Sequence, residues 1–459
     1  MASLLAHAAL LLWPLVALYL YSKLPIGQAT LWTVLGGFLL LPSQTALKFQ
    51  MIPPFDKTSI PNLAALLGCA IYSRKLPKFM WGFGLPELLV IVIVVGQFIT
   101  SLLNPDTIRI GATVLPGVGA YDAGSAARDT LIFMLPFFLA RQFSRSAEDT
   151  LYALRALVIA GLLYSLPVLF EFRMGPVLSI WMYGYNAGFV NGSGDLRPVV
   201  FIDNGLLLAF FFAPVVIAAG ALWRLRSHIS RFPPGATAAY LGGILLICRS
   251  FGSAFYMAFT LPLVRWASPR LQLRVACVLV TVATAYPLLR VADLVPTEPI
   301  LNVVSQLSTS HAGSLKTRFD NEHDLLAKAW ERRWFGWGRY GRERVYHGWN
   351  GADSSITDGF WIIIMGEWGL VGFFAVFGLL ALCVFRAAMA LKFTRTMQES
   401  VCLAALALVV AVNIFDLLPN GWLMPWTWLL AGTLLGRAEA LLATNRQLVR
   451  TPVLATRSS

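Results

Sequence analysis

The chain has 459 residues, of which 57% are hydrophobic and 13% are charged, and its mean hydropathy is +0.68. Soluble domains carry about twice that share of charged residues, so this composition excludes a soluble globular protein. The net charge of +13 lies in short connections between apolar runs rather than in one basic surface, which argues against a nucleic-acid partner.

Apolar runs recur along the whole chain, and most approach the length of about 20 residues that a bilayer crossing needs. The first run lacks the basic start and small-residue cleavage site of a secretory signal, so it is interpreted as a membrane helix. The runs at 60–73, 236–248 and 252–266 are short, and half-helices or tightly packed interior helices are expected there. The pattern predicts an all-α polytopic membrane protein with about 12 to 13 transmembrane helices, at 3–21, 25–42, 60–73, 84–103, 126–143, 151–170, 199–223, 236–248, 252–266, 275–292, 360–385, 401–418 and 424–442.

The basic residues predict how the chain is oriented in the membrane. Short connections rich in Lys and Arg are retained on the cytoplasmic side. Placing each such cluster inside makes the predicted helices alternate without conflict from Arg74 to the C-terminus, and only the first two helices stay ambiguous. The connections at 104–125, 172–198, 249–251 and 293–359 then lie outside. The inner clusters contain Arg74, Lys75, Lys78, Arg141, Arg145, Arg155, Arg224, Arg226, Arg231, Arg265, Arg270, Arg274, Arg386, Lys392, Arg395, Arg446, Arg450 and Arg457.

Neither a metal site nor a cofactor site is predicted. The five cysteines lie in or beside apolar runs, without CxxC or Cys/His zinc spacing, and are interpreted as packing residues. The glycines Gly336, Gly338 and Gly341 spell GxGxxG, but no strand precedes them and no βαβ unit follows. They are interpreted as a turn.

Two predicted outer connections carry an arginine at the membrane edge. Arg197 precedes Pro198 just before an apolar run, and Asp203 and Asn204 follow within it. Arg249 stands alone between two short apolar segments. A charge in this position is costly and is a functional-site hypothesis by default. The alternatives are an ordinary loop arginine beside proline for the first, and snorkelling or pairing with a carboxylate for Arg249.

The outer connection 293–359 is the candidate site, because it is long and contains many charged and aromatic residues. It divides the chain into an N-terminal membrane part (1–292), the loop, and a C-terminal membrane part with a cytoplasmic tail (360–459). Of the 59 charged residues, 15 lie between Ser314 and Gly359.

Within this loop, apolar residues at helical spacing predict an amphipathic helix over about 314–334, which lies on the membrane surface or caps a cavity. Arg318 and Glu322 are four residues apart and share an adjacent face of that helix. The tryptophans of the loop suit the membrane interface, where simple anchoring is the alternative to a specific role. The apolar residues are Leu315, Phe319, Leu326 and Trp330, and the tryptophans are Trp330, Trp334, Trp337 and Trp349.

Asp353 and Asp358 precede the helix that is expected to begin near Phe360. A carboxylate beside arginines stays ionised and can accept a proton. The predicted orientation puts Arg197, Arg249 and Arg318 at the same face, where guanidinium groups would grip a phosphate or pyrophosphate. Together these residues indicate group transfer from a lipid-linked phosphate donor.

Four stretches make the chain resemble the O-antigen ligase and O-antigen polymerase superfamily of bacterial polytopic glycan transferases. They are RPVVFIDNGLLLA, CRSFGSAF, the loop with SLKTRF and AWERRWFGWGRYG, and TDGFWIIIMGEWGLVGFFAVF. Their order and spacing agree over roughly residues 190–385, whereas the N-terminal third agrees only in being membranous. The resemblance implies a GT-C-like protein of the bacterial inner membrane with a periplasmic active site.

The resemblance also implies a donor, an undecaprenyl-diphosphate-linked oligosaccharide, used without metal or cofactor. Arg249 and Arg318 match the family's pyrophosphate-holding arginines, and Arg197 matches a weaker motif arginine. Ligases typically carry His-Asn where this chain has Thr357 and Asp358. That departure favours a polymerase of O-antigen or exopolysaccharide repeat units over a ligase that transfers the glycan to lipid A-core. It also makes Asp358 the candidate base.

Two residues and two further functions remain open after this comparison. His347 and Glu322 are the second candidates for the base. A flippase or transporter of the same lipid-linked oligosaccharide would also use outer arginines, and a non-enzymatic assembly factor is a further alternative. Against a transporter, no internal repeat relates the two halves, and the polar residues concentrate on one side. Chain-length regulators or flippase proteins are the expected protein partners of a polymerase.

Overall fold

The structure is a computed structural model that describes residues 3–49, 52–73, 77–80, 82–186, 197–229, 231–307 and 309–455. These residues form mostly helices, with two short β-hairpins and one short 3₁₀ helix, η1 (Leu391–Phe393). The helices are α1 (Leu4–Lys23), α2 (Ile26–Leu40), α3 (Ser59–Tyr72), α4 (Leu85–Leu102), α5 (Ala120–Phe143), α6 (Ala147–Met174), α7 (Leu178–Tyr183), α8 (Gly205–Arg224), α9 (Pro234–Ile247), α10 (Phe251–Trp266), α11 (Pro269–Val291), α12 (Thr297–Leu307), α13 (Thr309–Glu331), α14 (Phe360–Ala390), α15 (Met397–Asp416) and α16 (Pro425–Ala455).

The helices confirm the predicted polytopic membrane architecture. Within the described residues, eight of them are long and apolar enough to cross a membrane, namely α1, α4, α5, α6, α8, α11, α14 and α15. Each of the predicted apolar runs overlaps a helix, and the three runs predicted to be short are the short helices α3, α9 and α10. The expected amphipathic helix over 314–334 is α13, which begins five residues earlier and ends three earlier.

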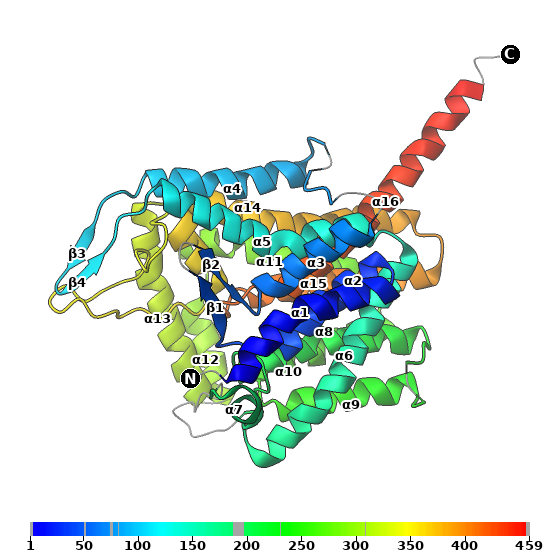
Figure 1. Cartoon of the computed structure of the whole chain (residues 1–459), viewed down its shortest axis with the longest axis horizontal. Helices are drawn as coiled ribbons and strands as arrows, with labels where there is room; N and C mark the ends of the chain where they lie inside the picture. Colours follow the sequence, from blue (N-terminus) through cyan, green and yellow to red (C-terminus); the bar gives the residue numbers. More distant parts are fainter. Residues whose placement is uncertain are drawn as a thin grey trace.

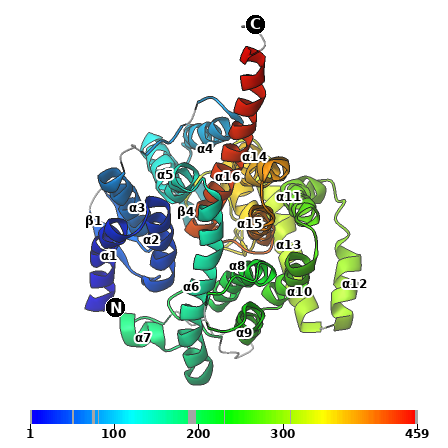
Figure 2. The same cartoon turned by 90° about the vertical axis from the view of Figure 1, so that its right-hand side faces the viewer.

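The long helices lie side by side in one bundle (Figures 1 and 2). α8 and α15 are almost wholly enclosed by their neighbours, and they carry the centre of the apolar core. α12 packs against α13 at the periphery of the bundle, and the end of α16 projects away from it (Figures 1 and 2). The enclosed position of α8 and α15 is the one expected for helices that are apolar on all sides.

Contacts between connections define two ends of the bundle. At the end that bears residues 293–359, called here the loop end, Arg332 and Arg342 pair with Asp106. The backbone N–H of Ser3 donates to the carbonyl of Tyr183 at 2.9 Å, so α1 starts at the same end as the connection after α6. This contact fixes the direction of the first two helices, which the charge pattern alone left ambiguous.

The basic connections meet at the opposite end of the bundle. Arg141 forms ion pairs of 2.8 Å with both Glu87 and Glu439, and Arg386 lies 3.6 Å from Glu439. Arg437 pairs with Glu399 at 3.3 Å. Lys and Arg clusters from separate connections therefore gather at one end, as the charge-based orientation requires.

Two β-hairpins at the loop end were not predicted from the apolar runs. They are β1 (Ala46–Phe49) with β2 (Ile52–Asp56), and β3 (Ile108–Ile110) with β4 (Thr113–Leu115), each pair antiparallel. Between β3 and β4, Gly111 has φ +56°, and a Cβ there would lie 2.7 Å from the backbone nitrogen of Gly351. The tip of this hairpin therefore packs directly against the backbone of the 293–359 loop.

The orientation of the bundle can be tested by cysteine accessibility. Ser354 lies exposed at the loop end, and Ser227 follows α8 at the opposite end, where its hydroxyl accepts a hydrogen bond from Arg155. If the basic end is cytoplasmic, a cysteine at Ser354 is labelled in intact cells by a membrane-impermeant maleimide and a cysteine at Ser227 is not. Labelling after permeabilisation serves as the control. The reverse pattern would move the candidate site to the cytoplasmic face.

Candidate functional site

Arg318 and Asp358 come together at the loop end. Arg318 lies on α13, and Asp358 lies just before α14. The Arg318 Nε is 3.3 Å from the Asp358 Oδ2, and the two side chains are 32% and 37% exposed. An exposed ion pair of this kind adds little to stability. Because both side chains are partly exposed, a ligand can reach both charges.

Asp358 does not cap α14. The N-cap residue is Gly359, and it makes no side-chain capping hydrogen bond. The first N–H of the helix, at Phe360, donates instead to the carbonyls of Leu417 and Asn420, at 3.0 Å each. A Cβ on Gly359 would lie 2.2 Å from the carbonyl oxygen of Leu418, so glycine is needed for this close approach. Asp358 is thus positioned over the end of α15 with its carboxylate free of a capping role.

A second carboxylate, that of Asp416, lies within electrostatic range of Arg318. Asp416 is the last residue of α15 and is only 7% exposed. Its Oδ1 accepts a hydrogen bond from Asn420 at 2.9 Å, and it interacts with the Tyr256 hydroxyl of α10. Arg318 therefore pairs directly with Asp358 and interacts with Asp416 only through its charge.

Sequence reasoning missed Asp416, although a signal for it was present. It follows a run of apolar residues, VVAVNIF, and an ionisable residue there is a functional-site hypothesis by the rule that selected Arg249. Its hydrogen-bond partner Asn420 and its neighbour Tyr256 give no separate signal, because nothing in the sequence pairs them with Asp416.

Arg249 lies in the turn between α9 and α10, at the loop end. Its φ is +51°, which is uncommon for a residue other than glycine, and its side chain is exposed. Tyr256 is seven positions further along the chain, which corresponds to about 10 Å of helix rise. Because Tyr256 contacts Asp416, Arg249 lies at the same end of the bundle as Arg318.

Arg197 also lies at this end, where the chain enters α8. Its side chain packs against Gly205, and its Nε is buried without a hydrogen-bond partner within the described part of the chain. The backbone N–H groups of Val199 and Val200 donate to the buried carboxylate of Glu171, at 2.8 and 2.7 Å. This backbone geometry is fixed by Glu171 rather than by the arginine.

The secondary candidates divide into one cap, one buried ion pair and two exposed groups. Asn204 caps α8, since its Oδ1 accepts from the N–H of Leu207 at 2.9 Å. Asp203 and His347 are both exposed, and His347 lies in a turn whose backbone bonds to Ala352. None of these groups contacts the Arg318–Asp358 pair through a described hydrogen bond or ion pair.

Glu322 takes a different partner from Arg318, although they are one turn apart on α13. Its Oε2 accepts from the Tyr286 hydroxyl at 2.9 Å and lies 3.4 Å from the Arg290 Nε. Burial raises the pKa of Glu322, while Tyr286 and Arg290 oppose the shift. Tyr286 and Arg290 belong to α11, so Glu322 holds α13 against that helix.

Lys57, in the turn after β2, is a further group that sequence reasoning did not select. Lys57 is only 7% exposed, and its ammonium donates to the carbonyl of Phe201 and lies 5.2 Å from the ring centroid of Phe38. Burial lowers the pKa of Lys57 to about 8, and the nearby Asp203 carboxylate opposes that shift. The contact fastens the β1–β2 hairpin to the segment that leads into α8.

A cavity of about 470 Å³ adjoins the first turn of α14. It lies between β2, α3, α5, α14 and the start of α16, and most of its wall is apolar. Phe360 lines it two residues after Asp358. The lining residues are the polar Asp56, Thr58, Ser59, Asp129 and Thr130, and the apolar Pro54, Phe55, Leu63, Ile132, Phe133, Met134, Phe360, Ile364, Trp368, Val376, Leu423 and Trp428.

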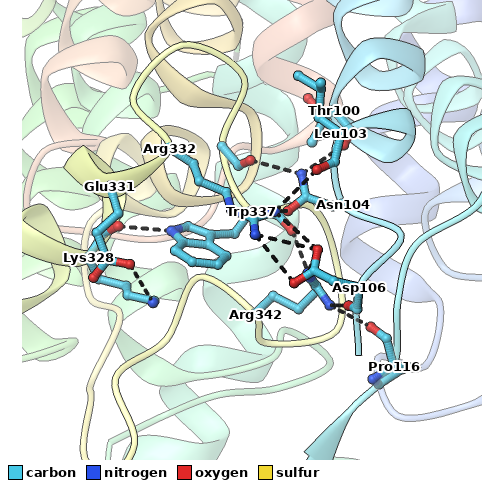
Figure 3. A network of polar contacts seen from close by, with 11 residues as sticks. Thr100, Leu103, Asn104, Asp106, Pro116, Lys328, Glu331, Arg332, Trp337 and Arg342 are labelled. Atoms are coloured by element: carbon cyan, nitrogen blue, oxygen red, sulfur yellow. Dashed lines mark hydrogen bonds and ion pairs between the residues drawn. The ribbon is translucent and has the colours of Figure 1, made fainter. Parts of the chain in front are cut away.

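A polar network holds the loop beyond α13 in place (Figure 3). The ring of Trp337 lies between Lys328, with Nζ 3.6 Å from the ring centroid, and Arg332, at 4.1 Å. The buried Arg342 donates to the carbonyls of Trp337, Asp106 and Pro116, and it pairs with the Asp106 carboxylate at 3.1 Å. This network joins the loop to the segment between α4 and α5.

Residues 333–338 of the loop insert into a break in α14. At Gly369 the helix is interrupted, with φ +67°. The N–H of Leu370 donates to the carbonyl of Arg333 at 2.7 Å, and the N–H groups of Trp337 and Gly338 donate to carbonyls of α14 at 2.8 and 2.9 Å. Backbone groups freed by a helix break must be satisfied in this way inside a membrane protein. The GxGxxG segment is a turn, and its Gly336 lets the two backbones touch.

Replacing Arg342 should destabilise the protein far more than replacing Arg344. Arg342→Met leaves three carbonyls and a carboxylate without their donor, and we expect a loss of about 3 kcal/mol in unfolding free energy. Arg344→Met breaks the half-exposed pair with Asp353 and a longer contact of 3.7 Å with Glu343, which together should cost less than about 1 kcal/mol. Thermal unfolding of the purified variants measures both. Equal melting temperatures for the two would contradict the structural role of Arg342.

The contacts at the loop end can bind an anion and move a proton. Arg318 offers a planar cation, Asp358 a carboxylate, and Arg197 and Arg249 further cations at the same end. Of the residues selected from sequence, the structure brings Arg318 and Asp358 into contact, and it gives Glu322 and Asn204 other partners.

In comparisons with known proteins, no family model and no curated sequence matches this chain.

Proposed function

We propose that this protein is a membrane glycosyltransferase that polymerises oligosaccharide repeat units linked to undecaprenyl diphosphate. The observation that carries the proposal is the contact between Arg318 and Asp358 at one end of a membrane bundle. A cation and a base held together are the groups that a transfer from a pyrophosphate donor requires.

The reaction would be an inverting displacement at the anomeric carbon of the donor glycan. The acceptor hydroxyl attacks this carbon, the bond from the carbon to the pyrophosphate oxygen breaks, and Asp358 takes the hydroxyl proton. Arg318, with Arg249 and Arg197 as the further candidates, stabilises the negative charge that builds on the departing lipid diphosphate. For a polymerase, the growing lipid-linked chain is the donor and a fresh lipid-linked repeat unit is the acceptor.

The cavity beside α14 supports a lipid-linked substrate. Most of its lining residues are apolar, and a minority, among them Asp56 and Asp129, are polar. Such a lining suits an amphipathic molecule better than a free sugar. Phe360 belongs both to the first turn of α14 and to the cavity, which brings the cavity next to Asp358.

The proposal separates from its alternatives by product. Purified protein given lipid-linked repeat units, without nucleotide or metal, should form a ladder of longer lipid-linked chains. A ligase would instead move the glycan to lipid A-core and form no ladder with repeat units alone. A flippase would form no new bond, and its deletion would leave single repeat units on the inner face of the membrane, whereas deletion of a polymerase leaves them on the outer face.

A further inference from the structure

The largest described cavity lies at the end of the bundle opposite Arg318. Its volume is about 930 Å³, and it forms where α11 begins, where α14 ends in η1, where α15 begins, and beside α16. The lining residues are Ser268, Pro269, Arg270, Ala388, Met389, Leu391, Lys392, Phe393, Thr394, Met397, Ser400, Leu442 and Asn445.

The polar lining of this cavity is cationic and rich in hydroxyl groups. Arg270 and Lys392 are both exposed, and within the described residues neither makes an ion pair with an acidic side chain. Arg274, one turn further along α11, is exposed as well. Three hydroxyls, from Ser268, Thr394 and Ser400, line the same space. Two cations without acids in a shared cavity favour an anionic ligand.

Exposed apolar side chains continue from the cavity along α11 and α14, which pack against each other. Met389 lines the cavity and is 53% exposed. Phe385, one turn before it on α14, is exposed as well. On α11, Leu271 and Val278 are 45% and 61% exposed. A soluble anion would make no use of this apolar surface. A molecule with an anionic head and hydrocarbon chains would cover both parts.

We propose that this cavity binds the headgroup of an anionic phospholipid, with the acyl chains lying along α11 and α14. Arg270 and Lys392 would hold the phosphate. The Ser268 hydroxyl, which accepts from the N–H of Leu271, would donate to a phosphate oxygen or to the glycerol. The predicted orientation places the cavity in the leaflet whose lipids carry the negative surface charge. The inference does not depend on the proposed transferase activity, because it concerns the other end of the bundle.

Native mass spectrometry of the detergent-purified protein tests this site. Cardiolipin, phosphatidylglycerol and phosphatidylcholine are titrated separately, and inorganic phosphate is titrated as the soluble anion. We expect the two anionic lipids to bind at least about tenfold more tightly than phosphatidylcholine, since each cation near a lipid phosphate contributes on the order of 1 kcal/mol. The double variant Arg270→Gln, Lys392→Gln should lose this preference.

A matched control separates the cavity from general attraction to a basic surface. Arg226→Gln with Arg231→Gln removes the same charge from the neighbouring connection between α8 and α9, outside the cavity. This pair should keep the preference for anionic lipid. Equal loss in both double variants, or no loss in either, would overturn the proposal. Binding of inorganic phosphate that competes with the lipid at equal concentration would replace it with a soluble-anion site. If the double variant folds poorly, the single exposed change Lys392→Gln replaces it. We expect this single variant to lose part of the preference for anionic lipid.

Discussion

Arg318→Ala should abolish or nearly abolish polymer formation while the protein still inserts in the membrane. Removing one preorganised donor from a leaving group costs on the order of a hundredfold in rate, and this variant also leaves Asp358 without its paired cation. Arg318→Lys should be poor as well, because an ammonium cannot reproduce the planar fork on a pyrophosphate. The length and yield of polymer in a deletion strain carrying each variant measure the effect. Arg249→Ala should behave like Arg318→Ala.

Arg333 and Arg344 provide controls for this experiment from the same loop. Arg344 pairs with Asp353, and the side chain of Arg333 lies near the rings of Trp330 and Trp334, so neither belongs to the Arg318 site. Alanine at these positions should leave most of the polymer. Near-normal polymer from both Arg318→Ala and Arg249→Ala would assign these arginines to ordinary packing and surface roles.

Asp358→Asn should lower the transfer rate by about a hundredfold or more, since that is the usual contribution of a general base. The change keeps the size of the side chain and removes its charge. Because Gly359 is the cap of α14, loss of helix capping is not an explanation for the effect. The rate of ladder formation with purified protein and lipid-linked repeat units gives the measurement.

Asp353→Asn is the matched control, since it removes a carboxylate that lies five residues before Asp358 and pairs with Arg344 instead. It should retain the rate. If Asp358→Asn is as fast as the unchanged protein, Asp358 is not the base, and Asp416 becomes the next residue to test. Glu322 and His347 would follow, the first held by Arg290 and Tyr286 and the second exposed in its turn.

Helix positions were predictable because a bilayer imposes one simple requirement, a run of apolar residues of sufficient length. That requirement located even the short helices α3 and α9. It carries no information about which polar groups meet at the helix ends. Arg318 and Glu322 illustrate this limit, since helical spacing put them on one shared face, whereas the structure pairs one with Asp358 and the other with Arg290.

The contacts that hold the loop were not predictable for a related reason. Asp106 and Arg342 are more than two hundred positions apart, and a single long-range pair leaves no periodic pattern in the sequence. The β3–β4 hairpin is only three residues on each strand, which is too short to stand out from a polar connection. Asp358 was predictable because it lies in a polar segment directly before a helix. For Asp416, at the end of an apolar run, the sequence does not show that it meets Tyr256 and Asn420.

The insertion of residues 333–338 into the break at Gly369 has a consequence for biosynthesis. The loop leaves the ribosome before α14, so its docking partner does not exist while the loop is first exposed. The loop can reach its final conformation only after α14 has been made and inserted. A chain that is cut between residues 339 and 359 and ends in a reporter protein lacks α14. Such a fusion would therefore report on a loop that has never docked. Single substitutions in the full-length chain avoid this artefact.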